Sequence, residues 1–365
     1  MQRLRRVLKI ERFFDCDFRA TANLYNHNGD IIVHKDEVYE SLLFSTDLYY
    51  LSTVIEIPSI YISSLIKRKK KKWTNLFFHY WDKKFFDSIT VEQLVSSHIS
   101  KEEIVNAIEK SGISENSIKA YLYILKEVSA LFFYSEFSLE RYEIIHDIVR
   151  NVLHFDRGGI FRALCFFRKK GDFTEVHSIS VMLLMLQVVS DLKRYKMRSC
   201  YKAITKEENE KFPLNKEMII SIGMGALLHD YGKVFVNEDI VDKDSSLALG
   251  ELDLIRMHPY YGVRALSIIK RVNSTILDIV GNHHFRYRVD EGKQSIVAQI
   301  CNIVDIYDAC RAIRPYKQDF SFMLTKEILE KENSFCKWNS HLYSLIINNS
   351  LLPFEKAITQ VQNHI

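Results

Sequence analysis

The stretch "LLHDYGK", residues 227–233, places His229 next to Asp230 at the end of an apolar run, and a glycine and a lysine follow at once. A neighbouring His and Asp can bind a metal ion, or they can be two polar residues at an ordinary helix end. The chain has a second such pair, His146 and Asp147 in "IIHDIVR". The dipeptide alone therefore settles nothing, and its meaning depends on whether further ligands lie at suitable places.

Further candidate ligands follow in the second half of the chain, where helices are expected to begin or end against apolar stretches. The histidines between residues 155 and 340 are His177, His229, His258, His283 and His284. Asp305 joins them from within "AQICNIVDIYDAC", a run so apolar that a buried carboxylate there needs a partner. A metal ion is an effective partner, and Arg311 or Arg314 is the alternative.

Each of these residues has an ordinary explanation when it is taken singly. His177 and His258 could be capping or hydrogen-bonded core histidines, and we interpret His146-Asp147 as a helix-surface pair. Together, five imidazoles and two carboxylates at helix ends in one helical region favour a metal site.

Composition indicates a mainly helical protein. The chain has 365 residues, which is enough for two domains, and it is 47% hydrophobic with only 12 Gly and 5 Pro. Fifty basic and 46 acidic residues leave a net charge of +4, which is too small to indicate a nucleic-acid partner, so no DNA is expected.

Cysteine usage and apolar runs predict a cytoplasmic location. The six cysteines include no C-x-x-C pair and are expected to be reduced thiols. The first residues lack the apolar core of a signal peptide, and the longest apolar runs, such as residues 181–189, are too short to span a bilayer. No transmembrane segment is therefore expected.

The pattern along the chain predicts a smaller N-terminal domain containing some β-strand, residues 1–135, and a helical bundle, residues 136–365. Residues 21–60 alternate around "HNGD", which is typical of a hairpin turn. The basic run Lys67–Lys72 is expected to be a solvated linker, with a phosphate-rich or membrane surface as the alternative contact. From residue 88 the pattern becomes helical. Later helices are predicted at 175–195, 215–230, 250–257, 260–270, 273–283 and 295–313.

The order His…HD-x-G-K…H-P…H-H…D-x-Y-D-A resembles the HD superfamily of metal-dependent phosphohydrolases. The similarity is greatest to its HD-GYP branch, the bacterial phosphodiesterases of the second messenger cyclic di-GMP. It runs from about residue 172 to 350 through "DFTEVHSISV", "ALLHDYGKVFV", "MHPYYGVRAL", "NHHFRYR" and "IVDIYDACRAIRPYK". Residues 21–50 are also weakly similar to the small accessory domain that often precedes such catalytic domains, which implies a regulatory role for residues 1–135.

The resemblance implies a binuclear metal centre. One cation would be held by His177, His229, Asp230 and Asp305. Asp230 would reach a second cation, completed by His258, His283 and His284. Nitrogen and oxygen donors without cysteine suit iron, manganese, nickel or zinc. A third-metal variant of the family uses a glutamate where this chain has Phe173, so two divalent ions are expected.

The resemblance also implies a mechanism in which a hydroxide bridging the metals attacks a phosphodiester of cyclic di-GMP, giving linear pGpG and/or GMP. Asp230 and Lys233 would be catalytic, with Lys233 also contacting the phosphate or helping the leaving group. Arg314 and Lys317 would grip the phosphates of the ligand. For these three cations, a solvated position on the surface is the alternative.

The loop "FRYRVDEGKQS", residues 285–295, departs from the family because it contains no Gly-Tyr-Pro. Arg286 or Tyr287 would then contact the substrate in its place. The departure keeps two alternatives open: a non-catalytic protein that binds a cyclic dinucleotide and signals, and an HD hydrolase of another nucleotide. Either is compatible with a homodimer or with a signalling protein as partner.

Overall fold

The computed structural model of this chain describes residues 6–8, 18–19, 24–25, 31–33, 38–39, 51–53, 81, 99–133, 137–168, 173–195, 214–241, 243, 246–284, 294–311, 321–351 and 355. Everything below concerns these residues. The basic run at residues 67–72 lies outside them.

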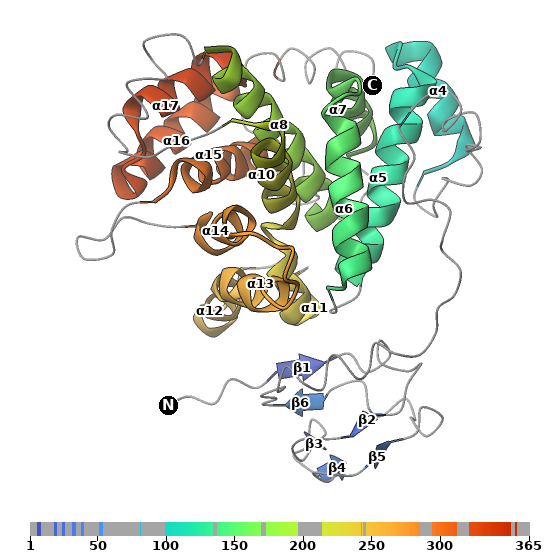
Figure 1. Cartoon of the computed structure of the whole chain (residues 1–365), viewed down its shortest axis with the longest axis vertical. Coiled ribbons are helices and arrows are strands. Elements are labelled where there is room, and N and C mark those ends of the chain that lie inside the picture. The colour runs from blue at the N-terminus through green and yellow to red at the C-terminus, as the bar shows by residue number, and fades with distance from the viewer. Residues whose placement is uncertain are drawn as a thin grey trace.

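Short antiparallel strands lie near the N-terminus, coloured blue in Figure 1. They are β1 (Arg6–Leu8), β2 (Phe18–Arg19), β3 (Leu24–Tyr25), β4 (Ile31–Val33), β5 (Val38–Tyr39) and β6 (Leu51–Thr53). One sheet has the order β1-β6-β3-β4, and β2 pairs with β5. The predicted turn between β3 and β4 lies outside the described residues. Because most of residues 1–98 lie outside them too, the small N-terminal domain stays a prediction.

The first helices are α4 (Lys101–Ser111), α5 (Glu115–Phe133), α6 (Leu139–Val152) and α7 (Arg157–Phe167). Their starts have local causes. The Ser100 hydroxyl accepts a hydrogen bond from the backbone N–H of Glu103. The Glu103 carboxylate accepts one from the backbone N–H of Ser100, which completes a capping box. The Ser138 hydroxyl accepts from the Arg141 N–H at 3.3 Å, which confirms the cap expected for α6.

Two apolar helices, α8 (Phe173–Tyr195) and α10 (Lys216–Leu228), pack together at the centre of the bundle. Figure 1 shows α5, α6 and α7 on one side of this pair, and α14 (Ser274–Asn282) and α15 (Ile296–Arg311) on the other. The stretch Thr174–Lys193 is apolar and long enough to cross a membrane, but its most apolar part is 89% buried inside the protein. It is therefore a core helix.

The remaining elements surround this centre. A 3-10 helix, η4 (Tyr231–Phe235), leads to α11 (Glu238–Val241), α12 (Leu249–Arg256) and α13 (His258–Leu266). The chain continues after α15 with α16 (Phe322–Cys336), α17 (Ser340–Leu345) and the π-helical turn η5 (Ile346–Ser350). Within the described part of residues 138–365 there is no strand. The predicted helical bundle is confirmed, with ends that differ from the expected spans by a few residues.

The buried apolar side chains from α4 to η5 form one continuous core. Residues on both sides of the predicted domain boundary near residue 135 contribute to it, and the division at that point stays a prediction. No disulfide joins the four cysteines that the structure describes, Cys165, Cys301, Cys310 and Cys336.

Gly232 allows η4 to lie against α13. A Cβ built on Gly232 would lie 1.8 Å from the carbonyl oxygen of His258 and 2.7 Å from the backbone nitrogen of Gly262. Both neighbours are backbone atoms, so no side chain can move aside to make room. The glycine that follows the His-Asp pair thus sets how closely α13 approaches Asp230.

We expect Gly232→Ala to lower the free energy of unfolding by about 3 kcal/mol, because the added methyl group must push α13 away from η4. Chemical denaturation of the full chain measures this change. Gly250→Ala is the control, since a Cβ at Gly250 meets nothing within 4 Å, and we expect it to be neutral or stabilising by up to about 1 kcal/mol. Equal effects at the two glycines would contradict the close-packing argument.

Candidate metal centre

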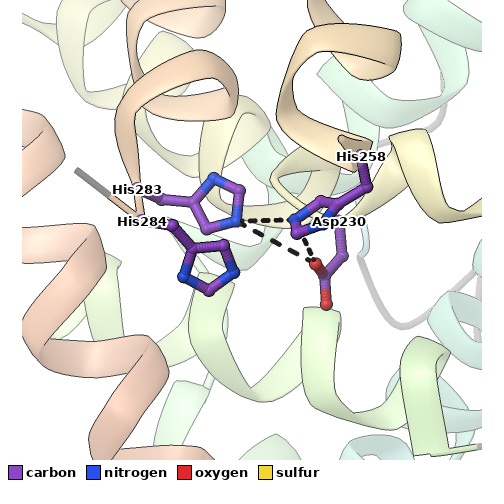
Figure 2. Close-up of side chains that lie close together, drawn as sticks. All are labelled: Asp230, His258, His283 and His284. Atoms are coloured by element: carbon purple, nitrogen blue, oxygen red, sulfur yellow. Dashed lines mark hydrogen bonds and ion pairs between the residues drawn. The ribbon is translucent and has the colours of Figure 1, made fainter. Parts of the chain in front are cut away.

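Five elements bring the predicted ligands into one buried cluster. His177 comes from α8, and His229 ends α10 with Asp230 directly after it. His258 begins α13, Asp305 lies on α15, and the paired His283 and His284 follow α14. Their ligand atoms form overlapping groups suited to a metal ion: His177, His229 and Asp230; Asp230, His258, His283 and His284; and His229, His283 and Asp305. Figure 2 shows the second group.

The two carboxylate oxygens of Asp230 face different histidines. Oδ2 lies 3.5 Å from His229 Nε2 and 3.8 Å from His177 Nε2. Oδ1 lies 3.2 Å from His258 Nε2 and 4.0 Å from His283 Nε2, and Figure 2 shows both rings pointing toward it. A carboxylate in this position can serve two neighbouring cations at once.

Asp305 lies between the two groups. Its Oδ1 is 2.9 Å from His177 Nε2 and 3.8 Å from His229 Nε2, and its Oδ2 is 3.7 Å from His284 Nδ1. Arg311 does not neutralise it, because that guanidinium binds Glu355 at 2.8 and 2.9 Å instead. The Arg311 explanation for Asp305 is therefore wrong, and Arg314 lies outside the described residues.

The hydrogen bonds of the histidine rings show which nitrogens carry lone pairs. His229 Nδ1 donates to the Ala226 carbonyl at 2.7 Å, His258 Nδ1 to Ile255 at 2.7 Å and His283 Nδ1 to Val280 at 3.0 Å. A carbonyl can only accept, so each Nδ1 carries a proton, and in a neutral ring this leaves a bare Nε2 that faces the cluster.

The Nε2 atoms of these rings lie close together. His258 Nε2 and His283 Nε2 are 3.0 Å apart, and in neutral rings two lone pairs at that distance would repel each other. Among the described residues, His229 Nε2 and Asp230 Oδ1 are buried without a hydrogen-bond partner, which is costly for polar atoms. A cation among these atoms would remove both penalties, so the donor set fits divalent metal ions.

Three donors fix Asp308, which in turn contacts the cluster. His177 Nδ1 donates to its Oδ2 at 2.7 Å, Arg168 Nη2 donates to the same oxygen at 2.5 Å, and the Ser180 hydroxyl donates to Oδ1. Sequence reasoning missed the role of Asp308 and gave Arg168 no role. The only sequence signal was a second carboxylate in the apolar run around Asp305.

A second support holds the paired histidines. The Asn302 side-chain amide donates to the His283 carbonyl and accepts from the Trp338 indole N–H at 2.9 Å. Gln294 donates to the Asn282 carbonyl at 2.6 Å. These side chains satisfy carbonyls at the C-terminal end of α14, which would otherwise lack partners.

Burial and charge set the protonation of the cluster. Burial is the largest influence on His229 and His283 and lowers the pKa of both rings, which favours the neutral imidazole that a metal needs. Burial alone would raise the pKa of Asp230, but Lys233 and His229 bring it well below its ordinary value. For His177, burial lowers the pKa, but hydrogen bonds and charges from Asp305 and Asp308 outweigh it and raise the pKa to about 9.

Lys233 belongs to the cluster and is not merely an exposed residue after a glycine. It lies on η4, its Nζ is 2.6 Å from Asp230 Oδ2, and its side chain is 25% exposed. His284, with a side chain 49% exposed, is the other partly open member. The predicted substrate contacts Arg286, Tyr287, Arg314 and Lys317 lie outside the described residues.

His146 and Asp147 lie apart from this cluster, on α6. The Asp147 carboxylate is 3.0 Å from Arg150 Nη2 and 3.7 Å from His146 Nδ1. Among the described residues, neither belongs to a group that could hold a metal ion. The two residues thus lie on one helix, where Asp147 pairs with Arg150 and His146.

Residues 174–310 match the family described as HD domain, so this part of the chain is an HD domain. It is related to phosphodiesterases of cyclic dinucleotides.

Three relatives are each 26% identical to this chain. The cyclic di-GMP phosphodiesterase PA4108 of Pseudomonas aeruginosa matches over 47% of this chain and 36% of its own length. For the 3'3'-cGAMP-specific phosphodiesterase 1 of Vibrio cholerae the shares are 53% and 47%. For a cyclic di-GMP phosphodiesterase of Thermotoga maritima they are 61% and 64%. The matches thus span less than two thirds of these relatives.

Among solved structures, Bd1817, an HDG"Y"P protein from Bdellovibrio bacteriovorus, aligns over 98% of both chains with a TM-score of 0.43 and 13% identity.

In the metal-free chain, the raised pKa of His177 predicts that stability falls with increasing pH. The pKa of His177 is about 9 in the folded chain and about 6.5 in the unfolded chain. Protonation of His177 therefore stabilises the fold in full below pH 6.5, and this stabilisation is lost as the pH rises through 9. We expect the free energy of unfolding in chelator to fall by up to about 3 kcal/mol across this window. His177→Gln should remove the fall and His146→Gln should keep it. A fall that survives in His177→Gln would refute the assignment.

Proposed function

We propose that this chain is a metal-dependent phosphodiesterase that hydrolyses cyclic di-GMP to linear pGpG and/or GMP. The observation that carries the proposal is the position of Asp230, whose two oxygens face two separate sets of histidines. Such a carboxylate suits a pair of cations, and paired cations are typical of phosphodiester hydrolysis. The names of two relatives quoted above support the choice of substrate.

Two sets of side chains, which share Asp230, would bind two cations. His177, His229, Asp230 and Asp305 would hold one divalent cation, and Asp230, His258, His283 and His284 the other. Bound iron, manganese, nickel or zinc would supply Lewis acidity and activate a water molecule. The carboxylates are ionised and burial keeps the His229 and His283 rings neutral with bare Nε2 atoms, so these atoms need not release a proton before they bind a cation.

Lys233 would contact the phosphate. Its ammonium group already neutralises part of the Asp230 charge from 2.6 Å, and its partial exposure leaves it within reach of a ligand. A cation beside the metal centre would offset the charge that develops on the phosphate oxygens. Arg286, Tyr287, Arg314 and Lys317 are proposed as further contacts with the dinucleotide.

A related cyclic dinucleotide is the second candidate substrate. The similarity to a 3'3'-cGAMP-specific phosphodiesterase covers 53% of this chain, and the loop at residues 285–295 lacks Gly-Tyr-Pro. The same centre would serve either ligand, because the phosphodiester is the same and only one base differs.

We also propose a cytoplasmic location, a regulatory role for residues 1–135, and a homodimer or a signalling protein as partner.

We expect Asp230→Ala to abolish hydrolysis of cyclic di-GMP and to remove most of the bound metal, because both sets of ligands lose their shared carboxylate. Anaerobically purified full-length chain is loaded with Fe²⁺ or Mn²⁺, its metal content is measured, and products are followed by chromatography. Asp147→Ala is the matched control from the other His-Asp pair and should keep both properties. Retained turnover in Asp230→Ala would refute the assigned site.

The same assay separates the candidate functions when the wild-type chain is given cyclic di-GMP, 3'3'-cGAMP and linear pGpG. We expect the highest kcat/KM with cyclic di-GMP. Faster turnover of 3'3'-cGAMP would transfer the proposal to the second candidate. Tight binding of either ligand without turnover by the metal-loaded chain would identify a binding and signalling protein instead.

A further inference from the structure

We propose that Arg168 is a positioning residue of the metal centre, which acts through Asp308 to hold the imidazole of His177 in its metal-binding orientation. The inference rests on the metal centre proposed above and adds to it a residue from α7, ahead of the segment that matches the HD domain.

Arg168 and Asp308 form a buried pair that directly contacts a predicted ligand. Arg168 is the C-terminal cap residue of α7 and is 8% exposed, while Asp308 is 1% exposed. Arg168 Nη2 and His177 Nδ1 lie 2.5 and 2.7 Å from the same oxygen, Asp308 Oδ2. The chain Arg168–Asp308–His177 therefore runs without a gap from α7 through α15 to α8.

The carboxylate determines what His177 presents to the cluster. Asp308 is an acceptor, so His177 Nδ1 must carry a proton and donate to it. In the neutral ring this leaves the Nε2 lone pair facing Asp305 and Asp230. A carboxylate behind a metal-binding histidine fixes the tautomer and ring orientation in the same way, and loss of such a partner lowers metal affinity about 10- to 100-fold.

Arg168 keeps Asp308 in place and compensates its charge. A buried carboxylate is stable only when it is paired and hydrogen-bonded. Among the described residues, three side chains donate to Asp308; Arg168 is the permanent cation of these, and Ser180 donates to the opposite oxygen. Without the guanidinium, Asp308 would be free to turn toward solvent or toward a cation in the cluster, and His177 would lose its fixed acceptor.

Another pair on the same helix provides a matched control. Arg311 on α15 is also 8% exposed, and it binds Glu355 with two hydrogen bonds of 2.8 and 2.9 Å. Breaking either pair leaves a buried carboxylate without its guanidinium. Only the Arg168 pair includes a carboxylate that receives a hydrogen bond from a predicted metal ligand.

The test measures Mn²⁺ affinity by isothermal titration calorimetry on chelator-treated full-length chain, with the free energy of unfolding of each metal-free variant measured alongside. We expect Arg168→Gln and Asp308→Asn each to weaken Mn²⁺ binding about 10- to 100-fold. The double variant should bind no more weakly than the weaker single variant, because the two residues act in series. Arg311→Gln should lose stability but keep its Mn²⁺ affinity.

Arg168→Lys retains the charge without the planar fork and should bind Mn²⁺ with an affinity between those of the wild type and Arg168→Gln. It decides the question if Arg168→Gln does not fold, since wild-type affinity in Arg168→Lys would then overturn the proposal. Equal weakening by Arg168→Gln and Arg311→Gln, or additive losses in the double variant, would also overturn it. A wild-type chain that binds no Mn²⁺ would overturn the metal centre itself.

Discussion

The structure depends on one electrostatic constraint, the burial of nitrogen and oxygen lone pairs that face one another. The Nε2 atoms of His258 and His283 lie 3.0 Å apart, and the ionised Asp230 lies beside them. The Nδ1 protons of both rings are already used on backbone carbonyls. A positive charge at its centre would stabilise this arrangement, and a divalent cation could supply it.

The packing of the surrounding helices holds these nitrogen and oxygen atoms close together. The rings of His229, His258 and His283 are each held at a helix end by the backbone carbonyl three residues earlier, so their directions follow from where the helices begin and end. Close contacts without side chains, as at Gly232, bring the helix ends within reach of one another. A substitution that pushes two helices apart at such a contact would therefore change the distance between the ligand atoms without replacing any ligand residue.

Behind the ligands lies a second set of polar contacts that comes from more distant parts of the chain. Arg168 and Ser180 hold Asp308 behind His177, and Asn302 joins the carbonyl of His283 to the indole of Trp338. The helix that carries Arg168 precedes the HD domain match and Trp338 follows it. The metal centre thus depends on packing beyond the segment that the family motif covers.

Local order in the sequence was enough to predict the helices and the identity of the clustered residues. Apolar periodicity, caps such as Ser138 and the spacing of the His and Asp motifs are local properties, so α8, α10 and α12 to α15 appeared close to their predicted spans. The partners of buried charges could not be predicted in this way. Asp308 meets a guanidinium 140 positions earlier in the chain, and Arg311 turns to Glu355 rather than Asp305. Such pairings arise when helices pack, because many sequence-distant groups compete for one buried charge and geometry selects among them.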